Sequence, residues 1–340
     1  MAGIPLAHHL LKHTPASVGL CVVLVSPNDE MLWPYATVRA VVPGLLDDNK
    51  VFPALGPAFS KYEPSKFEHV VGFAQGLEPE TNRIIVSANV ADRPQRIIEH
   101  NTLVIVTGSS CKDDMPFKSL SNTETTKQGM QSLRERTAAA RSSVVAGTGL
   151  RVSTAGVSPL GLEALTDIRQ TVVDELTQLK VNVITNTRVV DVSTAPAGNQ
   201  SLVLKRTDKA TDDTAATMLE ADLYIPAFGV RPNTTFAPEE MLDSDGRVKV
   251  DRTTLQVTGY ANILALGDAA NTQAATGKHA DSQADDTFVF AVTMGPNRGT
   301  GQLGSWRLWA WIIRGTIAKH FGTDYTPEIV TGNRTITQTR

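Results

Sequence analysis

NILALGDAA at residues 262–270 is one of three stretches that decide the fold; the others are LVIVTGSS at 103–110 and DLYIPAFGVRPNT at 222–234. In each, a short apolar run typical of a buried strand leads into a glycine. Glycine has no Cβ, so it permits close approach at the carboxyl edge, where open α/β sheets bind ligands. One such unit alone is explained as well by a tight turn, but three of them favour a nucleotide-binding sheet edge.

The rest of the chain alternates between strand-like and helix-like segments. Residues 20–26 and 142–147 are β-branched runs typical of strands buried on both faces, and further strands are predicted within 67–90, 150–156, 181–192 and 201–207. Helices are predicted at 121–141, where the sequence is polar, and at 162–179, where an apolar stripe recurs. Residues 31–45 indicate a site-lining loop with a short helix. The alternation predicts an α/β fold with mostly parallel sheets.

Composition and charge exclude several classes of protein. The chain has 340 residues, 41% hydrophobic and 20% charged, with a formal charge of −3, which excludes wholesale disorder and makes nucleic acid a poor partner. Two cysteines, Cys21 and Cys111, exclude a disulfide framework. We find no apolar run of the ~18 residues that a bilayer span needs, and the N-terminus lacks a secretory pattern. A soluble, cytoplasmic protein is expected, with mitochondrial or membrane-surface association as alternatives.

The glycine-containing stretches carry a resemblance to a known family. Together with VVLVSPNDEMLWPYATVRAVVPG (22–44), MPFK (115–118), AARSSVVAG (139–147) and GPNRGTGQLGSWRLWAWIIRG (295–315), they resemble the FAD-dependent pyridine-nucleotide oxidoreductases. The closest likeness is to the branch of apoptosis-inducing-factor-like and ferroptosis-suppressor-like NAD(P)H:quinone oxidoreductases, in its fungal form.

The resemblance implies a fold and a reaction. The fold is α/β with two Rossmann-like nucleotide-binding domains, in which an FAD domain is split around an inserted NAD(P)H domain. The implied boundaries are 1–115 for the first part of the FAD domain, 116–245 for the NAD(P)H domain, and 246–340 for the second part with a C-terminal helix. The implied reaction passes electrons from NAD(P)H through FAD to a quinone or a similar small acceptor.

The resemblance also implies site residues. Asp268 would hold the ribityl chain of FAD, and Gly267 would let the backbone approach it. Other residues are expected around the same cofactors: Gly3 at the first dinucleotide turn, Thr107 and Gly108 near the pyrophosphate, Pro34, Arg39 and Pro43 beside the flavin, and Gly229 and Pro232 at the border of the nicotinamide domain.

The sequence departs from the family pattern in three places. The family opens with a strand and a G-x-G-x-x-G turn that holds the pyrophosphate, whereas Gly3 here stands as the only remaining glycine of that turn, and Ser26 replaces the usual ribose-binding acid. A helix is missing between Gly147 and Leu150, and another after Gln283. An alternative function is therefore an inactive pseudoenzyme or interaction scaffold that has lost the phosphate-binding loops.

The C-terminal region contains two further motifs. Residues 299–304 spell G-x-G-x-x-G, but too little chain follows for a dinucleotide domain, so we expect a glycine-rich turn there. Residues 305–321 predict a helix packed through its tryptophans as core, in preference to a dimer or membrane-surface helix. Lys319 and His320 alone supply too little positive charge for a lipid anchor.

Two residue types invite a chemical role that the sequence does not support. His9 and His13 lie four positions apart on a predicted helix, near His8, but without an acidic or cysteine partner for a metal ion. We expect packed or solvated histidines and no metal site. Cys111 has no basic residue before it that would lower its pKa, so we expect an unreactive thiol.

Overall fold

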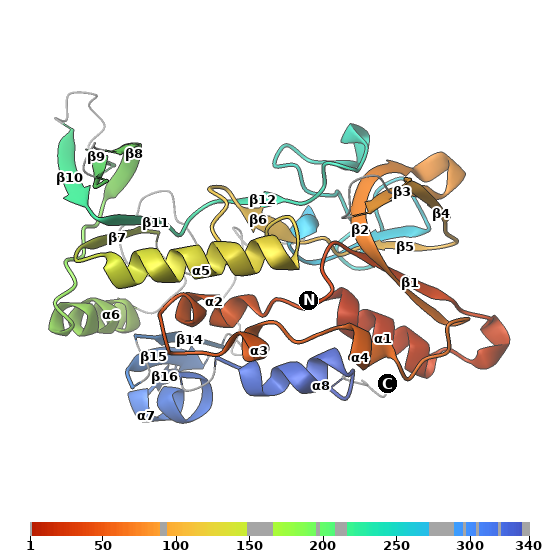
Figure 1. Ribbon diagram of the computed structural model, residues 1–340, viewed down its shortest axis with the longest axis horizontal. Coiled ribbons are helices and arrows are strands. Elements are labelled where there is room, and N and C mark those ends of the chain that lie inside the picture. The colour runs from red at the N-terminus through yellow and green to blue at the C-terminus, as the bar shows by residue number, and fades with distance from the viewer. Residues whose placement is uncertain are drawn as a thin grey trace.

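The computed structural model describes residues 2–88, 94–147, 166–194, 198–207, 216–271, 289–294, 297–303, 306–318 and 321–334. Helices and strands alternate along much of this length, as predicted (Figure 1). The predicted strand at 150–156 and the expected gaps after Gly147 and after Gln283 fall outside the described residues.

The first half of the chain builds a mixed sheet of four strands. Strand β1 (Val22–Ser26) pairs in parallel with β2 (Phe67–Glu78), and β3 (Arg83–Ala88) and β4 (Arg96–Glu99) extend the sheet in antiparallel fashion. A short turn after Glu78 joins β2 to β3, as the sequence predicts. All five residues of β1 are half-buried, so the prediction of burial on both faces is wrong.

Strands β5 (Leu103–Ile105) and β13 (Ile263–Ala265) pair in parallel, although about half of the chain separates them. This pairing places the end of the 103–110 stretch beside the end of the 262–270 stretch. The apolar side chains of both strands belong to one core cluster with β2 and β3. The pairing therefore unites the first and last thirds of the chain, as a split domain requires.

The middle of the chain forms a second parallel pair. Strand β7 (Ser143–Ala146) pairs with β11 (Leu223–Pro226), beside an antiparallel sheet of β8 (Thr187–Thr194), β9 (Gln200–Arg206) and β10 (Thr217–Ala221). Side chains along β7 alternate between exposed and half-buried, so its predicted burial on both faces is also wrong. Helix α5 (Thr123–Ala139) packs between β11 and α2 (Pro34–Ala40) through Met130 and Leu133 (Figure 1).

A two-stranded ribbon joins these regions. Strand β6 (Ser109–Cys111) runs antiparallel to β12 (Val230–Pro232), with Pro232 opposite Ser109. In Figure 1 the ribbon lies between the β7–β11 pair and the sheet of β2, β3 and β4. It carries the second predicted glycine unit toward the carboxyl end of β5.

The C-terminal region differs from its prediction. Residues 299–303 and 306–308 form strands β15 (Gly299–Leu303) and β16 (Trp306–Leu308) of an antiparallel sheet with β14 (Val289–Thr293). Helix α7 (Ala310–Ile313) and a π-helical turn at Arg314–Ala318 follow. The predicted glycine turn and continuous helix are therefore wrong. A Cβ on Gly299 would lie 2.6 Å from Ile313 Cγ2, so this glycine lets α7 pack tightly on the strand.

The predicted packing of the tryptophans as core is wrong as well. Trp306, Trp309 and Trp311 are 80%, 63% and 67% exposed. The buried contacts of this sheet are made instead by Met294 with Ile168 and Val172 of α6 (Thr166–Gln178).

Residues 321–334, with the short helix α8 (Thr326–Val330), pack onto the start of the chain. His8 of α1 (Gly3–His13) is fully buried, and its Nε2–H donates to the carbonyl of Val330 at 2.6 Å while Tyr62 donates to its Nδ1. Further along the segment, Trp33 donates to the carbonyl of Phe321 at 2.8 Å. Two short helices, α3 (Asp48–Val51) and α4 (Gly56–Phe59), complete this region.

Candidate functional site

The carboxyl ends of β5 and β13 form the candidate site. The backbone N–H of Leu266 donates to the carbonyl of Ile105 at 3.1 Å, so the two chains leave the sheet side by side. Directly beyond, the hydroxyl of Ser109 donates to Asp268 Oδ2 at 2.7 Å. Thr107, Gly108, Gly267 and Asp268 therefore meet at one edge, as the sequence predicts.

Asp268 lies at the centre of a polar cluster. Lys118 Nζ donates to Asp268 Oδ2 at 2.5 Å and to the Ser109 hydroxyl at 2.8 Å. The Arg247 guanidinium donates to the backbone carbonyl of Asp268. One carboxylate is thus faced by two cations from separate loops, and this group of four residues carries net positive charge.

The environment of Asp268 lowers the pKa of its carboxyl group. Burial acts to raise that pKa, because it removes water from the charged form. The hydrogen bonds from Lys118 and Ser109, and the charges of Lys118 and Arg247, outweigh burial, so the pKa lies below its usual value. Asp268 therefore stays an acceptor at neutral pH, which suits the hydroxyl groups of a sugar alcohol.

The glycines at this edge leave space beside the backbone. Gly108 and Gly267 have φ of 67° and 75°, and a Cβ on either would meet nothing within 4 Å. Gly3 serves a different purpose, since its Cβ would lie 2.9 Å from Val106 Cγ2 and 3.8 Å from Leu24 Cδ1. It lets α1 begin close to the end of β5. The first turn of α1, which carries the N–H groups of Gly3 and Ile4 but none on Pro5, thus starts beside the Thr107–Gly108 turn.

The second glycine unit reaches the same edge through the ribbon. Asn233 donates from its backbone N–H to Gly108 at 2.9 Å and from its side chain to the carbonyl of Thr107 at 3.0 Å. Pro232 precedes it, opposite Ser109. Gly229 accepts a hydrogen bond from the N–H of Lys112 at 3.3 Å. Pro232 is thus brought to the site, while Gly229 lies farther along the ribbon.

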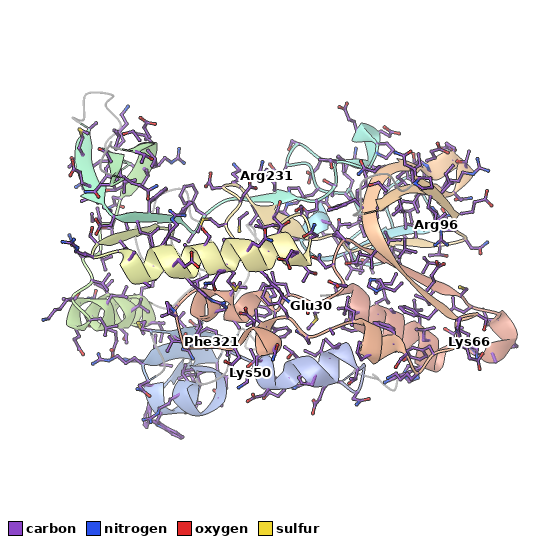
Figure 2. The ribbon with its side chains drawn as sticks, in the orientation of Figure 1. Glu30, Lys50, Lys66, Arg96, Arg231 and Phe321 are labelled. Carbon is purple, nitrogen blue, oxygen red and sulfur yellow. The ribbon has the colours of Figure 1, made fainter. Side chains whose placement is uncertain are left out.

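Helix α2 borders the cluster through the chain that carries Lys118. Thr37 donates to the carbonyl of Phe117, the residue before Lys118, at 3.3 Å. Pro34 begins α2, and Arg39 is buried near its end with its guanidinium 4.2 Å from the ring centre of Phe321, which is labelled in Figure 2. Burial lowers the pKa of Arg39. Pro34 and Arg39 therefore lie on an element that contacts the site.

Two shallow hollows lie elsewhere on the surface. One of about 490 Å³ is lined by α3, α4 and α8, and one of about 650 Å³ lies between α5 and residues 43–49. Pro43 lines the second hollow, and no other predicted site residue lines either one. The chemistry of Asp268 and its neighbours is a better guide to the site than the size of these hollows.

Three residues of the cluster, Ser109, Lys118 and Arg247, are not among the site residues that the sequence predicts. Ser109 and Lys118 lie inside TGSS and MPFK, two motifs of the family resemblance, so a signal for them was present. Arg247 lies in a turn with no motif. None of the three could be paired with Asp268 without the fold, because between 21 and 159 positions separate them from it.

The end of the second parallel pair differs from this edge. Gly147 follows β7 and approaches Ala227, so that a Cβ on Gly147 would lie 2.6 Å from the carbonyl oxygen of Ala227. The sequence predicts that a helix and the phosphate-binding loop are missing between Gly147 and Leu150, and the chain after Gly147 lies outside the described residues. Cys111 is half-buried, and burial raises the pKa of its thiol, as expected for an unreactive cysteine.

The residues at the β5–β13 edge fit an FAD molecule. An ionised carboxylate, two open glycine backbones, a helix start and excess positive charge suit a ribityl chain joined to a pyrophosphate. Within the described parts of the chain, no cluster of three metal-ligating side chains occurs. No described helix has the length and apolar content to cross a membrane.

The chain is similar to known oxidoreductases. The profile of the pyridine nucleotide-disulphide oxidoreductase family matches residues 1–284. Oxidoreductase ptaL of Pestalotiopsis fici (strain W106-1 / CGMCC3.15140) is 31% identical over 373 residues, covering 98% of this chain and 96% of ptaL. That alignment is longer than the chain, so ptaL contains residues without a counterpart here.

A more distant relative and a solved structure extend the comparison. Ferroptosis suppressor protein 1 of Mus musculus is 27% identical over 177 residues, covering 45% of this chain and 46% of that protein. The sulfide:quinone oxidoreductase of Aquifex aeolicus shares the fold, with a TM-score of 0.67 at 14% identity, covering 97% of this chain and 89% of that one.

Proposed function

This chain belongs to the pyridine nucleotide-disulphide oxidoreductase family and is an oxidoreductase, and we propose that it uses FAD to pass electrons from NAD(P)H to a quinone or a similar small acceptor. The observation that carries the proposal is the cluster of Asp268, Ser109 and Lys118 at the joined carboxyl ends of β5 and β13. Ligands of α/β sheets bind at such an edge.

Each group at the edge has a role toward FAD. The Asp268 carboxylate accepts hydrogen bonds from ribityl hydroxyls, and Lys118 and Arg247 balance the negative charge of the pyrophosphate. Gly108 and Gly267 leave room for the cofactor to lie against the backbone. The first N–H groups of α1, beginning at Gly3, add further donors. When bound, FAD supplies hydride acceptance and onward electron transfer.

Two neighbouring elements complete the proposed binding region. Pro34 and Arg39 on α2 are assigned to the flavin side, because α2 contacts the carbonyl of Phe117 next to Lys118. Gly229 and Pro232 on the β6–β12 ribbon are assigned to the border with NAD(P)H. The proposed division is 1–115 and 246–340 for the FAD domain, and 116–245 for the NAD(P)H domain.

The proposed acceptor rests on the fold alone. The Aquifex aeolicus protein, which shares the fold, is named for a quinone substrate. A quinone takes up the two electrons that a hydride delivers, so it suits the proposed flow from NAD(P)H.

A second candidate is an interaction scaffold that binds neither cofactor. The observation in its favour is the length of the ptaL alignment, which exceeds this chain and so indicates missing internal segments. Loss of several charge-assisted hydrogen bonds to phosphate, each worth ~1.5–3 kcal/mol, would weaken cofactor binding by orders of magnitude.

The visible absorption spectrum of the purified chain tests the proposal. After incubation with FAD and desalting, we expect flavin bands near ~450 nm that bleach on anaerobic addition of NADH or NADPH and recover on addition of a water-soluble benzoquinone. A protein that is folded by circular dichroism yet colourless would overturn the proposed use of FAD in favour of the scaffold. Bands that bleach but do not recover would overturn the quinone assignment alone.

A further inference from the structure

Three side chains of the N-terminal region hold the far end of the C-terminal segment 321–334. They donate to three consecutive backbone carbonyls: His8 to Val330 at 2.6 Å, Lys61 to Thr331 at 2.5 Å, and Lys12 to Gly332. The carbonyls that end a helix have no partner within it, and Val330 is the last residue of α8. The three donors therefore fasten the end of α8 to α1 and to the turn that follows α4.

His8 is the buried centre of this contact. Its side chain is fully buried, and its ring is stacked on Phe59 with 4.1 Å between the ring centres. The hydroxyl of Tyr62 donates to Nδ1 at 2.9 Å, while Nε2 donates to the segment. A Cβ on Gly332 would collide with the His8 ring, so the segment lies directly on the imidazole. A ring that donates from one nitrogen and accepts at the other is neutral.

The surroundings of His8 oppose a charge on its ring. Burial is the largest effect and lowers the pKa of His8, and the hydrogen bond to the carbonyl acts less strongly in the other direction. The charges that act on the ring from α1 and from the turn after α4 are those of Lys12 and Lys61, and both lower the pKa further. On α8, the acidic Glu328 is paired with Arg334 at 3.9 Å. His8 is therefore held in its neutral form while the segment is in place.

We propose that His8 is a pH-sensitive latch, which keeps the segment 321–334 on α1 while the ring is neutral and releases the segment when the ring is protonated. A proton on Nδ1 places a positive charge between two lysines and away from water, and Nδ1 then no longer accepts from Tyr62. Release of the segment exposes the ring to water, which stabilises the charged form. The closed arrangement is thus favoured above the usual histidine pKa of ~6.5 and weakens as pH falls below it.

The latch bears on the elements that border the candidate site. At its other end the segment contacts α2, because Trp33 donates to the carbonyl of Phe321 at 2.8 Å and the Arg39 guanidinium lies 4.2 Å from the Phe321 ring centre. At the latch, α8 lies beside α1 (Figure 1), and α1 begins at Gly3 next to Val106. Release of the segment therefore removes a link between α1 and α2. The inference rests on these contacts and does not depend on the proposed reaction.

Hydrogen exchange followed by mass spectrometry tests the latch on the full chain, between pH ~7.5 and ~5.5, on either side of the usual histidine pKa. After correction for the intrinsic effect of pH on exchange, we expect protection of the amides in 321–334 to fall by up to ~10-fold per pH unit below ~6.5, the limit for one proton. The N–H groups of Thr331 and Gly332 donate within the segment, and a helix as short as α8 does not persist once released. Amides of β2 and β3 should keep their protection, because a local opening leaves the rest of the fold in place.

Two variants assign the pH dependence to one histidine. His8→Gln keeps a side-chain donor for the Val330 carbonyl but cannot titrate, so protection of the segment should no longer depend on pH. His13→Gln is the matched control, because His13 lies on the same helix and is exposed. It should retain the wild-type loss of protection in acid. An NMR titration of the wild-type chain should show one imidazole, absent from His8→Gln, whose midpoint lies below ~6.5.

Three results would overturn the proposal. Protection of the segment that does not change with pH in the wild-type chain is one, and this measurement needs no variant to fold. A loss of protection that His8→Gln retains would assign the effect to another group. A simultaneous loss in β2 and β3 would show acid unfolding of the whole fold in place of a local opening. A colourless chain whose segment opens in acid would refute the proposed use of FAD while supporting this inference.

Discussion

The two parallel strand pairs, β5–β13 and β7–β11, each carry a hydrogen-bonded aspartate, but at opposite ends of the strands. At β5–β13 the cluster of Asp268, Ser109 and Lys118 lies at the carboxyl ends of the strands. At β7–β11 the carboxylate of Asp222 lies before β11 and accepts from the backbone N–H groups of Ser142 and Arg141, which precede β7. Carboxyl ends bind ligands in α/β sheets, so the first cluster is the one proposed to bind the cofactor, whereas the second joins the starts of β7 and β11.

Replacing each carboxylate with an amide is the most direct test of the different roles given to Asp268 and Asp222. Asp268→Asn should weaken FAD binding by about 10–100-fold, as expected for loss of a charge-assisted hydrogen bond of ~1.5–3 kcal/mol. Asp222→Asn should leave FAD affinity within about twofold, because its carboxylate lies at the other end of its strands. Titration of flavin fluorescence measures both. Equal losses of FAD affinity in the two variants would refute the proposal that FAD binds at the carboxyl ends of β5 and β13.

The second prediction concerns Lys118 and pH. The pKa of Asp268 is held below its usual value, so binding that requires its ionised form persists in mild acid and is lost as pH falls through that lowered pKa. Lys118→Met should raise the pKa of Asp268 and move this loss of FAD binding to higher pH, with ~10-fold weaker binding at pH 7. Lys118→Arg should restore both the lowered pKa of Asp268 and the FAD affinity at pH 7.

A carboxyl ¹³C NMR titration without FAD tests the same coupling directly, with Asp268→Asn used to assign the resonance. An unchanged Asp268 titration in Lys118→Met would show that Lys118 serves packing alone.

The third prediction addresses stability at the β7–β11 pair. Hydrogen bonds from the backbone and hydroxyl of Ser142, and from the N–H of Arg141, lower the pKa of Asp222. Its stabilising effect is therefore present above the usual pKa of an aspartate and disappears as pH falls through the lowered value. Asp222→Asn should lower Tm at pH 7, and the difference from wild type should close in acid. Calorimetry across this pH range measures the Tm difference between wild type and Asp222→Asn. A difference that persists in acid would contradict the stabilising role of the ionised Asp222 carboxylate.

The smallest effects are expected from two glycines. Gly267→Ala should cost about 1 kcal/mol of stability, because an alanine at positive φ is strained, and the added methyl group enters the space proposed for FAD. Gly147→Ala should leave FAD binding unchanged but destabilise more, since its Cβ would meet the carbonyl of Ala227 at 2.6 Å. Thermal unfolding should show the larger loss of stability for Gly147→Ala. FAD titration should show the larger loss of affinity for Gly267→Ala.

Local patterns in the sequence predicted much of the fold. The apolar runs that end at Gly108 and Gly267 identified two strands and the turns after them, because a strand–glycine junction is a local signal. The meeting of these turns followed from the family resemblance, and the parallel pairing of β5 with β13 confirms it. The amphipathic and polar helices at 166–178 and 123–139 also followed from local periodicity.

Long-range contacts determine the features that local sequence patterns did not predict. Lys118 and Arg247 face Asp268 from separate loops, and no local pattern records such a meeting. The sequence predicts one tryptophan-rich helix over 305–321, whereas the structure has strand β16 and helix α7 within it. Packing of Ile313 on Gly299 instead divides it into a strand and a short helix. Short apolar segments are ambiguous between helix and strand for this reason.

The contact between residues 321–334 and α1 bears on when this protein reaches its final shape. His8 and Val330, which hydrogen-bond at 2.6 Å, are 322 positions apart. At about 5–20 residues per second, a ribosome needs roughly 15–60 s to make the chain between them. Throughout that interval the helix that begins at Gly3 lacks the partner that covers His8. The packing around His8 is therefore completed only after residue 330 has been synthesised.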